Sequence, residues 1–395
     1  MSVQRPLPWT DWLRDLDEPV VVFALDRRPE DETFFAHVEH FDSFDGHGLT
    51  EIRAVELAER FPFSRIFAHS EHDILRAAQL REWFGLAGQS CDSARAYRDK
   101  VYMKDKARLG GVATPPYREL TTPLDLYRFA ADHGYPCVVK PRWGAGARGV
   151  RILESAADLQ DFLRRPLPEQ SMAEGFVEGH TFHVDGLATD GEMLFVCAST
   201  YFNSCISFMT GESTGSVLLD PGTPLWRRLV EETRKLIAAF PPAPHFAFHA
   251  EFFLDADRLL LCEIACRPGG SRIADMIEEA CGLNMYEQWL RRSLGLPVEL
   301  PPPRPWRSAG RLFVPPRRGR LLSLPESVPF DWVVDYRPSS VPGQIWADPD
   351  FCSANVASFI VAGRGADEIE ARLRLLDEWF RDQAVWEDLP PAHPA

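Results

Sequence analysis

Two short β-type runs that each carry a glutamate constrain the fold of this chain more than any other feature. The runs Phe246–Leu254 and Leu259–Ile264 are rich in apolar residues, and the polar turn Asp255-Ala-Asp257 lies between them. Two such runs joined by a short polar turn predict a β-hairpin. A hairpin can bring Glu251 and Glu263 to one place, where their carboxylates repel each other unless a cation lies between them. The pair therefore predicts a cation site on a sheet.

The cation that suits this pair is Mg²⁺ bound to the phosphates of a nucleotide. Mg²⁺ takes one or two carboxylates and completes its octahedral shell with phosphate oxygens. Arg267 follows the second glutamate and begins the segment Arg-Pro-Gly-Gly270. Its guanidinium can hold an anion beside the metal, or it can form a structural salt bridge to Glu251 or Glu263. The glutamate pair therefore predicts an enzyme that uses ATP and Mg²⁺, with Mn²⁺ as an alternative metal.

Length and charge exclude several classes of protein. A chain of 395 residues predicts two or three domains. Its formal charge of −15 argues against a nucleic-acid or anionic-membrane partner, because phosphate contacts demand a basic face. No apolar run approaches the roughly 20 residues that span a bilayer, and Met1–Pro6 does not start a signal peptide. The eight cysteines are therefore expected as reduced thiols in a cytoplasmic protein.

Residues 1–92 are expected as an N-terminal domain, in which residues 18–92 alternate strands and helices. Pro19–Leu25 is a continuous apolar run, which predicts a strand buried on both faces. Ser64–Ala68 predicts a second strand, and Leu49–Phe61 and Asp73–Phe84 predict helices. This order indicates a small open parallel sheet of the α/β class. No Gly-x-Gly-x-x-Gly follows the first strand, so no dinucleotide site is expected there.

Three further parts follow along the chain. Residues 93–177 predict a small α+β module, residues 178–300 a large antiparallel sheet covered by helices, and residues 301–395 a C-terminal subdomain beyond the proline-rich segment Pro297–Pro305. The expected strands are Pro136–Lys140, Val150–Leu153, Ser171–Val177, Gly310–Val314, Val356–Ala362 and most of 181–202 and 246–264. The expected helices are 93–109, Pro123–His133, Ala156–Arg164, 224–239, 273–294 and Asp367–Phe380.

A lysine and a glycine-rich loop lie next to each other in the small module. Lys140 ends an apolar strand, and the loop Trp143–Gly149 precedes the next strand. Glycines let backbone amides approach and surround anionic oxygens. The order strand, lysine, loop, strand predicts that this segment covers phosphates. Its candidate contacts are Lys140, Gly144, Gly146, Gly149 and, as a secondary contact, Arg148.

Two other segments have both a functional and a structural interpretation. Lys100 lies in a charged helical stretch, in which Lys104 and Lys106 are expected on a solvated face. Glu174–Val177 joins the small module to the large sheet, and its backbone groups can either contact an adenine edge or form an ordinary linker.

The histidines and cysteines near the hairpin predict no catalytic or metal site of their own. His183 and His249 are interpreted as hydrogen-bonded sheet residues rather than catalysts. Cys262 and Cys266 lack the spacing of a zinc site, and His249 does not complete one. No arrangement of serine or cysteine with histidine indicates nucleophilic catalysis by the protein.

Taken in order, these elements resemble the ATP-grasp superfamily, and within it the carboxylate–amine ligases. The resemblance covers roughly residues 93–295, and the preceding α/β module resembles the domain that usually comes first in these enzymes. The segments that carry it are Arg98-Asp-Lys100, Gly111–Pro116, Tyr135–Pro141, Gly144–Gly149, Glu174–Gly179, Glu251 and Glu263-x-x-x-Arg267.

The resemblance implies that ATP lies between two α+β subdomains, with the glycine loop as a lid. It implies that Glu251 and Glu263 hold magnesium, and that Arg267, Glu263 and Lys140 are catalytic. The nucleotide-binding residues that it implies are Lys100, Lys140, Gly144, Gly146, Arg148, Gly149, Glu174, Gly175, Phe176, Val177 and Thr181.

Two positions depart from the pattern of the family. Many relatives carry an asparagine metal ligand two residues after the second glutamate, where this chain has Ala265. Two alternatives follow from this: water completes the metal's shell, or one of the usual two metals binds weakly. A carboxylate that often holds the ribose is replaced by Thr181.

Enzymes of this kind activate a carboxylate by phosphoryl transfer from ATP, and an amine or sometimes a thiol attacks the acyl phosphate. The segments Gly310–Pro316 and Gly319–Leu322 resemble the extra subdomain of L-amino-acid ligases and biotin-carboxylase-like relatives, and no biotin-carrier Met-Lys-Met is present. The expected partners are a small carboxylic acid, in the first instance an amino acid, and an amine, and a homodimer is compatible with the sequence. Two alternatives stay open, namely the loading of an acid onto a carrier-protein thiol and a catalytically decayed regulatory protein.

Overall fold

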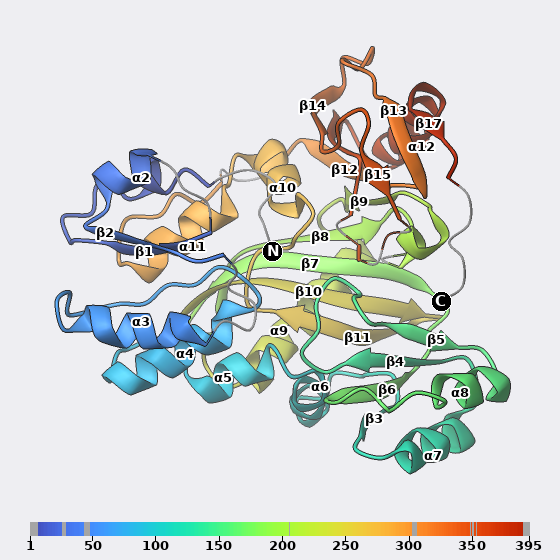
Figure 1. Ribbon diagram of the computed structural model, residues 1–395, viewed down its shortest axis with the longest axis horizontal. Coiled ribbons are helices and arrows are strands. Elements are labelled where there is room, and N and C mark those ends of the chain that lie inside the picture. The colour runs from blue at the N-terminus through green and yellow to red at the C-terminus, as the bar shows by residue number, and fades with distance from the viewer. Residues whose placement is uncertain are drawn as a thin grey trace.

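An eight-stranded antiparallel sheet forms the centre of the protein (Figure 1). The computed structural model describes residues 7–25, 29–42, 48–204, 206–301, 306–347, 349, 351–352 and 354–389. The strand order in the sheet is β11-β10-β7-β8-β9-β12-β16-β14. In chain order the strands are β7 (His180–Thr189), β8 (Glu192–Tyr201), β9 (Thr214–Leu218), β10 (His245–Asp255), β11 (Arg258–Ala265), β12 (Ser308–Val314), β14 (Val333–Pro338) and β16 (Ala357–Gly363).

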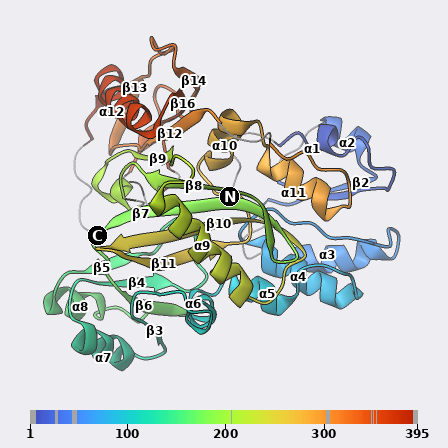
Figure 2. The ribbon, with the colours of Figure 1, turned by 180° about the vertical axis from the view of Figure 1, so that it is seen from behind.

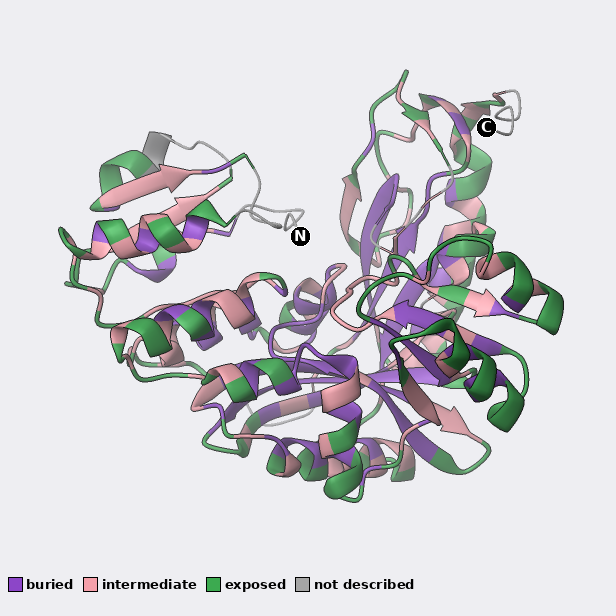
Figure 3. Ribbon diagram, turned by 60° about the horizontal axis from the view of Figure 1, so that its bottom comes forward, coloured by how far each residue is buried: buried purple, intermediate pink, exposed green. Residues whose placement is uncertain are grey.

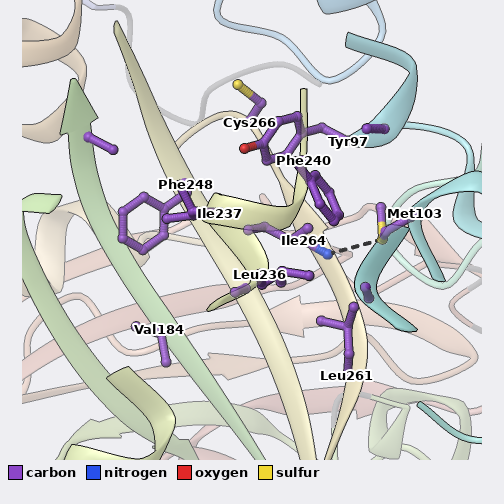
Figure 4. Close-up of a cluster of buried hydrophobic side chains, with 14 of the residues drawn as sticks. Tyr97, Met103, Val184, Leu236, Ile237, Phe240, Phe248, Leu261, Ile264 and Cys266 are labelled. Atoms are coloured by element: carbon purple, nitrogen blue, oxygen red, sulfur yellow. Dashed lines mark hydrogen bonds between the residues drawn. The ribbon is translucent and has the colours of Figure 1, made fainter. Parts of the chain in front are cut away.

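Side chains alternate between the two faces of β10, as the period of a strand requires. Phe246, Phe248 and Phe252 pack in a core with the long helix α9 (Pro224–Ala239), which crosses the back of the sheet in Figure 2. Figure 4 shows part of this core, where Leu236 and Ile237 of α9 meet side chains from the strands. Ala247, which points the other way, packs with α10 (Ile273–Cys281) and α11 (Met285–Ser293). The central strands are therefore buried on both sides (Figure 3).

The helix expected over 273–294 is two helices rather than one. α10 ends at Gly282, which has a left-handed φ of 76°, and the side chain of Asn284 caps α11. The helix expected over 93–109 is likewise divided into α5 (Cys91–Ala96) and α6 (Lys100–Leu109), because the side chain of Asp99 accepts hydrogen bonds from the first backbone amides of α6. Caps rather than apolar spacing fix these boundaries.

A four-stranded sheet with two covering helices forms the small module beside the large sheet (Figure 1). Its helices pack their apolar faces on the strands, where Leu126 and Phe129 are fully buried. Thr122 and Asp125 cap the first helix, and a proline occupies its first turn. The elements are β3 (Tyr117–Leu120), α7 (Pro123–His133), β4 (Cys137–Pro141), β5 (Arg151–Leu153), α8 (Ala156–Phe162) and β6 (Ser171–Gly175), with strand order β3-β6-β4-β5.

The N-terminal domain contains a two-stranded parallel sheet, in which β1 (Val21–Ala24) pairs with β2 (His37–His40). The strand expected at Ser64–Ala68 is wrong, since those residues form no strand. The polar sequence His-Val-Glu-His of β2 is not recognisable as a strand by its apolar pattern. β1 is half-buried at all its positions, so the expectation of burial on both faces is also wrong. The helices of this domain are α1 (Trp9–Trp12), α2 (Pro29–Phe34), α3 (Leu49–Ala58), α4 (Asp73–Phe84) and α5.

The C-terminal part adds three strands to the large sheet and covers them with α12 (Ala366–Gln383). The apolar face expected for this helix is confirmed, since Ile369, Leu373, Leu376 and Phe380 are fully buried. Gly310 of β12 allows the close approach, because a Cβ there would lie 2.4 Å from Ile369 Cγ2. A separate three-stranded sheet consists of β13 (Gly319–Ser323), β15 (Ile345–Trp346) and β17 (Val385–Glu387).

The helices in the described part of the chain are all too short or too polar to cross a membrane.

Candidate active site

One cavity between the large sheet and the small module brings together nearly all the predicted site residues. Gly149 is the exception: it does not line the cavity, and its φ of 76° serves the course of the loop instead. The predicted residues that line the cavity are Lys100, Lys140, Gly144, Gly146, Arg148, Glu174, Gly175, Phe176, Val177, Thr181, Glu251, Glu263 and Arg267.

Glu251 and Glu263 come together on β10 and β11, as the hairpin predicted, and a register shift between Glu251 and Phe252 makes them direct cross-strand neighbours. Burial would raise the pKa of Glu263, but the charges of Lys100, Lys140 and Arg267 outweigh it and lower the pKa to about 2. The pKa of Glu251 is also lowered, because hydrogen bonding and charge from His249 outweigh its burial. Two ionised carboxylates side by side in a cavity fit Mg²⁺, whereas the buried methyl of Ala265 offers no ligand.

A row of hydrogen-bonded groups orients Glu251. Its Oε1 accepts a hydrogen bond from the hydroxyl of Tyr201 and lies 3.3 Å from His249 Nε2. His249 Nδ1 lies 2.8 Å from Asp185 Oδ1, and the other Asp185 oxygen lies 2.5 Å from His183 Nδ1. The three ligand atoms of His183, Asp185 and His249 lie within 4.8 Å of one another, but each is already hydrogen-bonded within the group. The interpretation of both histidines as satisfied sheet residues is confirmed.

Lys100 connects the glycine-rich loop to Glu263. Its Nζ donates to the carbonyl oxygen of Gly144 at 2.7 Å and lies 3.2 Å from Glu263 Oε2. The loop itself contacts the C-terminal part: the amide of Cys352 donates to the Gly146 carbonyl at 3.1 Å, and the Arg148 guanidinium lies over the Phe351 ring. The loop thus contacts both Lys100, the partner of Glu263, and the C-terminal part of the chain.

Glu174 holds two lysines with its side chain, a role that the sequence did not predict. Its Oε2 lies 2.5 Å from Lys140 Nζ and its Oε1 lies 2.6 Å from Lys104 Nζ. The expectation that Lys104 is solvated is wrong, because this side chain is fully buried and also donates to the carbonyls of Leu261 and Cys262 at 2.9 Å. Lys106 remains half-exposed. A helical charge pattern does not reveal which lysine a neighbouring strand covers.

The end of the cavity at which the sequence predicts the adenine has apolar walls that sequence reasoning did not identify. Phe176 and Val177 lie beside them in the connection from β6 to β7, and the Phe176 amide donates to the Pro136 carbonyl at 3.4 Å. The wall residues are Val138, Ile152, Phe253 and Cys262.

Arg267 is held by a carboxylate from the N-terminal domain. Its Nε lies 2.6 Å from Glu71 Oε2. The structural interpretation of Arg267 had assumed a salt bridge to Glu251 or Glu263, and this partner was wrong. Glu71 Oε1 lies 2.5 Å from Arg98 Nη1, and Arg98 Nη2 donates to the Trp143 carbonyl at 2.8 Å. Burial would raise the pKa of Glu71, but the two arginines outweigh it and lower the pKa. This carboxylate connects the arginine of the site to the start of the glycine-rich loop.

Replacing Glu71 with glutamine should both destabilise the protein and misplace Arg267. We expect a loss of about 2 kcal/mol in the free energy of unfolding, since two buried arginines lose their counter-charge. Activity should fall by about 10-fold, because small displacements of a positioning group are costly. Chemical denaturation and steady-state kinetics measure the two effects. Glu18→Gln, which breaks an exposed ion pair to Arg65, is the control and should change neither. A Glu71→Gln variant with wild-type stability and activity would contradict the view that Glu71 positions Arg267.

Acid should unfold the protein by protonating the carboxylates of the site. The pKa of Glu263 is lowered from 4.5 to about 2, and those of Glu71, Glu174 and Asp185 are lowered too. A carboxylate with a lowered pKa binds fewer protons in the folded than in the unfolded state, so its stabilising contribution is complete above pH 4.5 and disappears as the pH falls towards about 2. The urea midpoint without metal should therefore drop steadily in that window. A midpoint that stays constant or rises on acidification would be inconsistent with these ion pairs.

Comparisons with known proteins find sequence similarity to an ATP-binding domain and to amino acid ligases. The family model described as the ATP binding domain of the carbamoyl-phosphate synthase L chain matches residues 99–181. The L-arginine-specific L-amino acid ligase of Bacillus subtilis is 25% identical over 304 residues, which are 71% of this chain and 73% of that protein. The alanine–anticapsin ligase of Bacillus subtilis strain 168 is 25% identical over 65% of this chain and 62% of its own length.

Solved structures extend the similarity over almost the whole chain. The crystal structure of an L-amino acid ligase from Bacillus licheniformis has a TM-score of 0.77 at 21% identity, and the match covers 97% of this chain and 96% of that one. A carboxyaminoimidazole ribonucleotide synthase from Aspergillus clavatus, complexed with ATP, has a TM-score of 0.71 at 18% identity over 95% and 94% of the two chains. The shared fold includes the N-terminal and C-terminal parts as well as the site.

Proposed function

We infer that this chain is a member of the ATP-grasp superfamily, and on that premise we propose that it is an ATP-dependent ligase that joins a small carboxylic acid to an amine. The acid, in the first instance an amino acid, is activated as an acyl phosphate, and the product is an amide or a dipeptide with release of ADP and phosphate. One observation carries the proposal: the ionised pair of Glu251 and Glu263 shares a cavity with Lys100, Lys140 and Arg267.

The residues of the cavity divide into a metal side and a phosphate side. Glu251 and Glu263 would hold Mg²⁺, which neutralises the charge that develops during phosphoryl transfer. Lys140 keeps its positive charge, because Glu174 and other carboxylates outweigh its burial and raise its pKa. Lys100 is held between the glycine loop and Glu263, so it can follow the loop onto the phosphates.

The chemistry in this proposal has two steps. In the first, an oxygen of the carboxylate attacks the γ-phosphorus of ATP, and the bond from that phosphorus to ADP breaks. In the second, the amine attacks the acyl carbon, the phosphate leaves, and the amine loses a proton to solvent. Arg267, fixed by Glu71, would bind the acid and stabilise the oxyanion of the second step together with the backbone at Gly270, which also lines the cavity.

The class of substrate is supported by the similarity to ligases whose names specify amino acids. The matches to the L-arginine-specific ligase and the alanine–anticapsin ligase both cover most of this chain. These matches favour an amino acid as one of the two substrates, but the particular amino acids in the relatives' names are not assigned to this protein.

The direct test measures ADP and phosphate release with ATP and Mg²⁺ against pairs of amino acids and amines. The proposal predicts release that needs both partners, equal amounts of ADP and phosphate, and a condensed product in the mass spectrum. Release that depends on a carrier protein would favour the thiol-loading alternative. Tight ATP binding without release in any pair would contradict the ligase and favour a regulatory protein, an outcome compatible with Ala265 at a usual ligand position.

A further inference from the structure

Arg311 of β12 is a buried arginine whose charge has no carboxylate partner in the described part of the chain. Its side chain lines the same cavity, and the residue is only 3% exposed. Its Nε donates to Ser216 Oγ at 3.2 Å, whereas its Nη1 is buried without a hydrogen-bond partner. The guanidinium lies 5.9 Å from the centre of the Tyr201 ring and 5.4 Å from that of Phe313.

This arrangement is costly for a residue that only supports the fold. Taking a charge out of water costs several kcal/mol, and aromatic faces and a single hydroxyl offset only part of that. Two other buried arginines of the protein have carboxylates at 2.6 Å, Glu71 for Arg267 and Asp335 for Arg272. Among the described residues, Arg311 therefore differs from these two in having no carboxylate partner, and its buried Nη1 donor is already fixed in place.

The position of Arg311 in the sheet assigns it to the end of the cavity away from the nucleotide. β12 is separated from β10, which carries Glu251, by β7, β8 and β9. Tyr201 connects the two, because its hydroxyl donates to Glu251 while its ring lies beside the Arg311 guanidinium. The adenine walls, in contrast, include residues of the small module. An anion bound to Arg311 would thus lie beyond the metal pair.

We propose that Arg311 binds a carboxylate of the substrates that is not consumed in the reaction. This inference rests on the proposed ligase function and narrows its substrate class. The carboxylate belongs either to the amino acid that supplies the amine, as its free α-carboxylate, or to a dicarboxylic acid of which only one end is activated. The planar fork of arginine matches a carboxylate with two parallel hydrogen bonds, and Nη1 is free to make one of them.

The test measures equilibrium binding by calorimetry with MgADP present, so that no turnover is needed. The probes are the standard amino acids with their amides, and succinate and glutarate with their monomethyl esters. Wild type should bind at least one of the carboxylate probes saturably. Arg311→Met should weaken that binding on the order of 100-fold, as the loss of a charge-assisted bidentate pair requires, without changing the affinity for MgADP.

The paired probes distinguish the two sources of the carboxylate. If an amino acid binds and its amide does not, the amine substrate supplies the carboxylate. If a dicarboxylate binds and its monoester does not, the activated acid supplies it. Equal binding of the carboxylate probes to wild type and to Arg311→Met would overturn the inference, and so would a wild-type protein that no carboxylate probe saturates.

Two controls separate this role from a structural one and from the proposed function. The unfolding temperature of ligand-free Arg311→Met should equal or exceed that of wild type, because a buried unpaired charge has been removed; a lower temperature would overturn the inference. Arg311→Lys, which keeps the charge but loses the fork, should weaken binding on the order of 10-fold. Failure of ADP release with every acid and amine would contradict the ligase but not this binding result. Release combined with unchanged binding by Arg311→Met would contradict the present inference alone.

Discussion

Glu263→Gln is expected to lower ADP release on the order of 1,000-fold while the protein stays folded. The glutamine lacks the charge that holds Mg²⁺, and the stabilisation of the transferring phosphoryl group is lost with the metal. The protein should lose some stability with the ion pair to Lys100 but stay folded, because Glu263 is partly exposed and the repulsion with the neighbouring Glu251 is relieved at the same time. An assay of ADP release and a thermal unfolding experiment on the same preparation measure the activity and the stability of the variant.

The matched control for this variant is Glu192→Gln, which changes an exposed glutamate at the start of β8 outside the cavity. It should retain wild-type turnover. Wild-type turnover in Glu263→Gln itself would remove this residue from the metal site and leave the hairpin with a structural role only.

Glu174→Gln should cause the largest loss of stability among single changes in the site, about 3–5 kcal/mol in the free energy of unfolding. The side chain is 3% exposed and its two oxygens contact Lys104 and Lys140 at 2.6 and 2.5 Å. A neutral amide leaves two buried ammonium groups close to each other without the carboxylate that contacts both. Urea denaturation at neutral pH measures the loss.

A second substitution checks the physical reason. Adding Lys104→Met to Glu174→Gln removes one of the two uncompensated charges, so the double variant should be more stable than Glu174→Gln alone. The losses of Glu174→Gln and of Lys104→Met alone could instead add up in the double variant, or Glu174→Gln could lose less than about 1 kcal/mol. Either result would mean that the buried ion pairs do not hold this part of the site together.

Local patterns predicted the central part of the site well. The hairpin of β10 and β11 depends on neighbouring residues, so its existence and the proximity of Glu251 to Glu263 followed from the sequence. The register shift between Glu251 and Phe252, which makes the two glutamates direct partners, did not. The helix Pro123–His133 was predicted to its ends, because a proline and a capping box mark its start and a glycine follows it. The nucleotide, metal and catalytic roles of the site residues, and the domain boundaries at residues 93, 178 and 301, stay predictions.

Contacts between distant parts of the chain could not be predicted in the same way. Glu71 lies in a loop without periodicity, and only the packing of the N-terminal domain brings it to Arg267. Lys104 and Lys106 occupy the same charged stretch, yet β11 covers the first and leaves the second half-exposed. Arg311 sits in an apolar strand whose sequence indicates burial but not the absence of a partner. Each of these depends on burial, which a single segment does not determine.

The measurement that tests the central claim most directly follows the oxygen atoms of the acid. An acid that supports ADP release would be labelled with ¹⁸O in its carboxylate and incubated with ATP, Mg²⁺ and the amine. The account predicts that one labelled oxygen appears in the released phosphate, since the acyl phosphate passes that oxygen to phosphorus when the amine displaces it. Label in AMP, or phosphate that carries no label, would contradict activation of the carboxylate as an acyl phosphate.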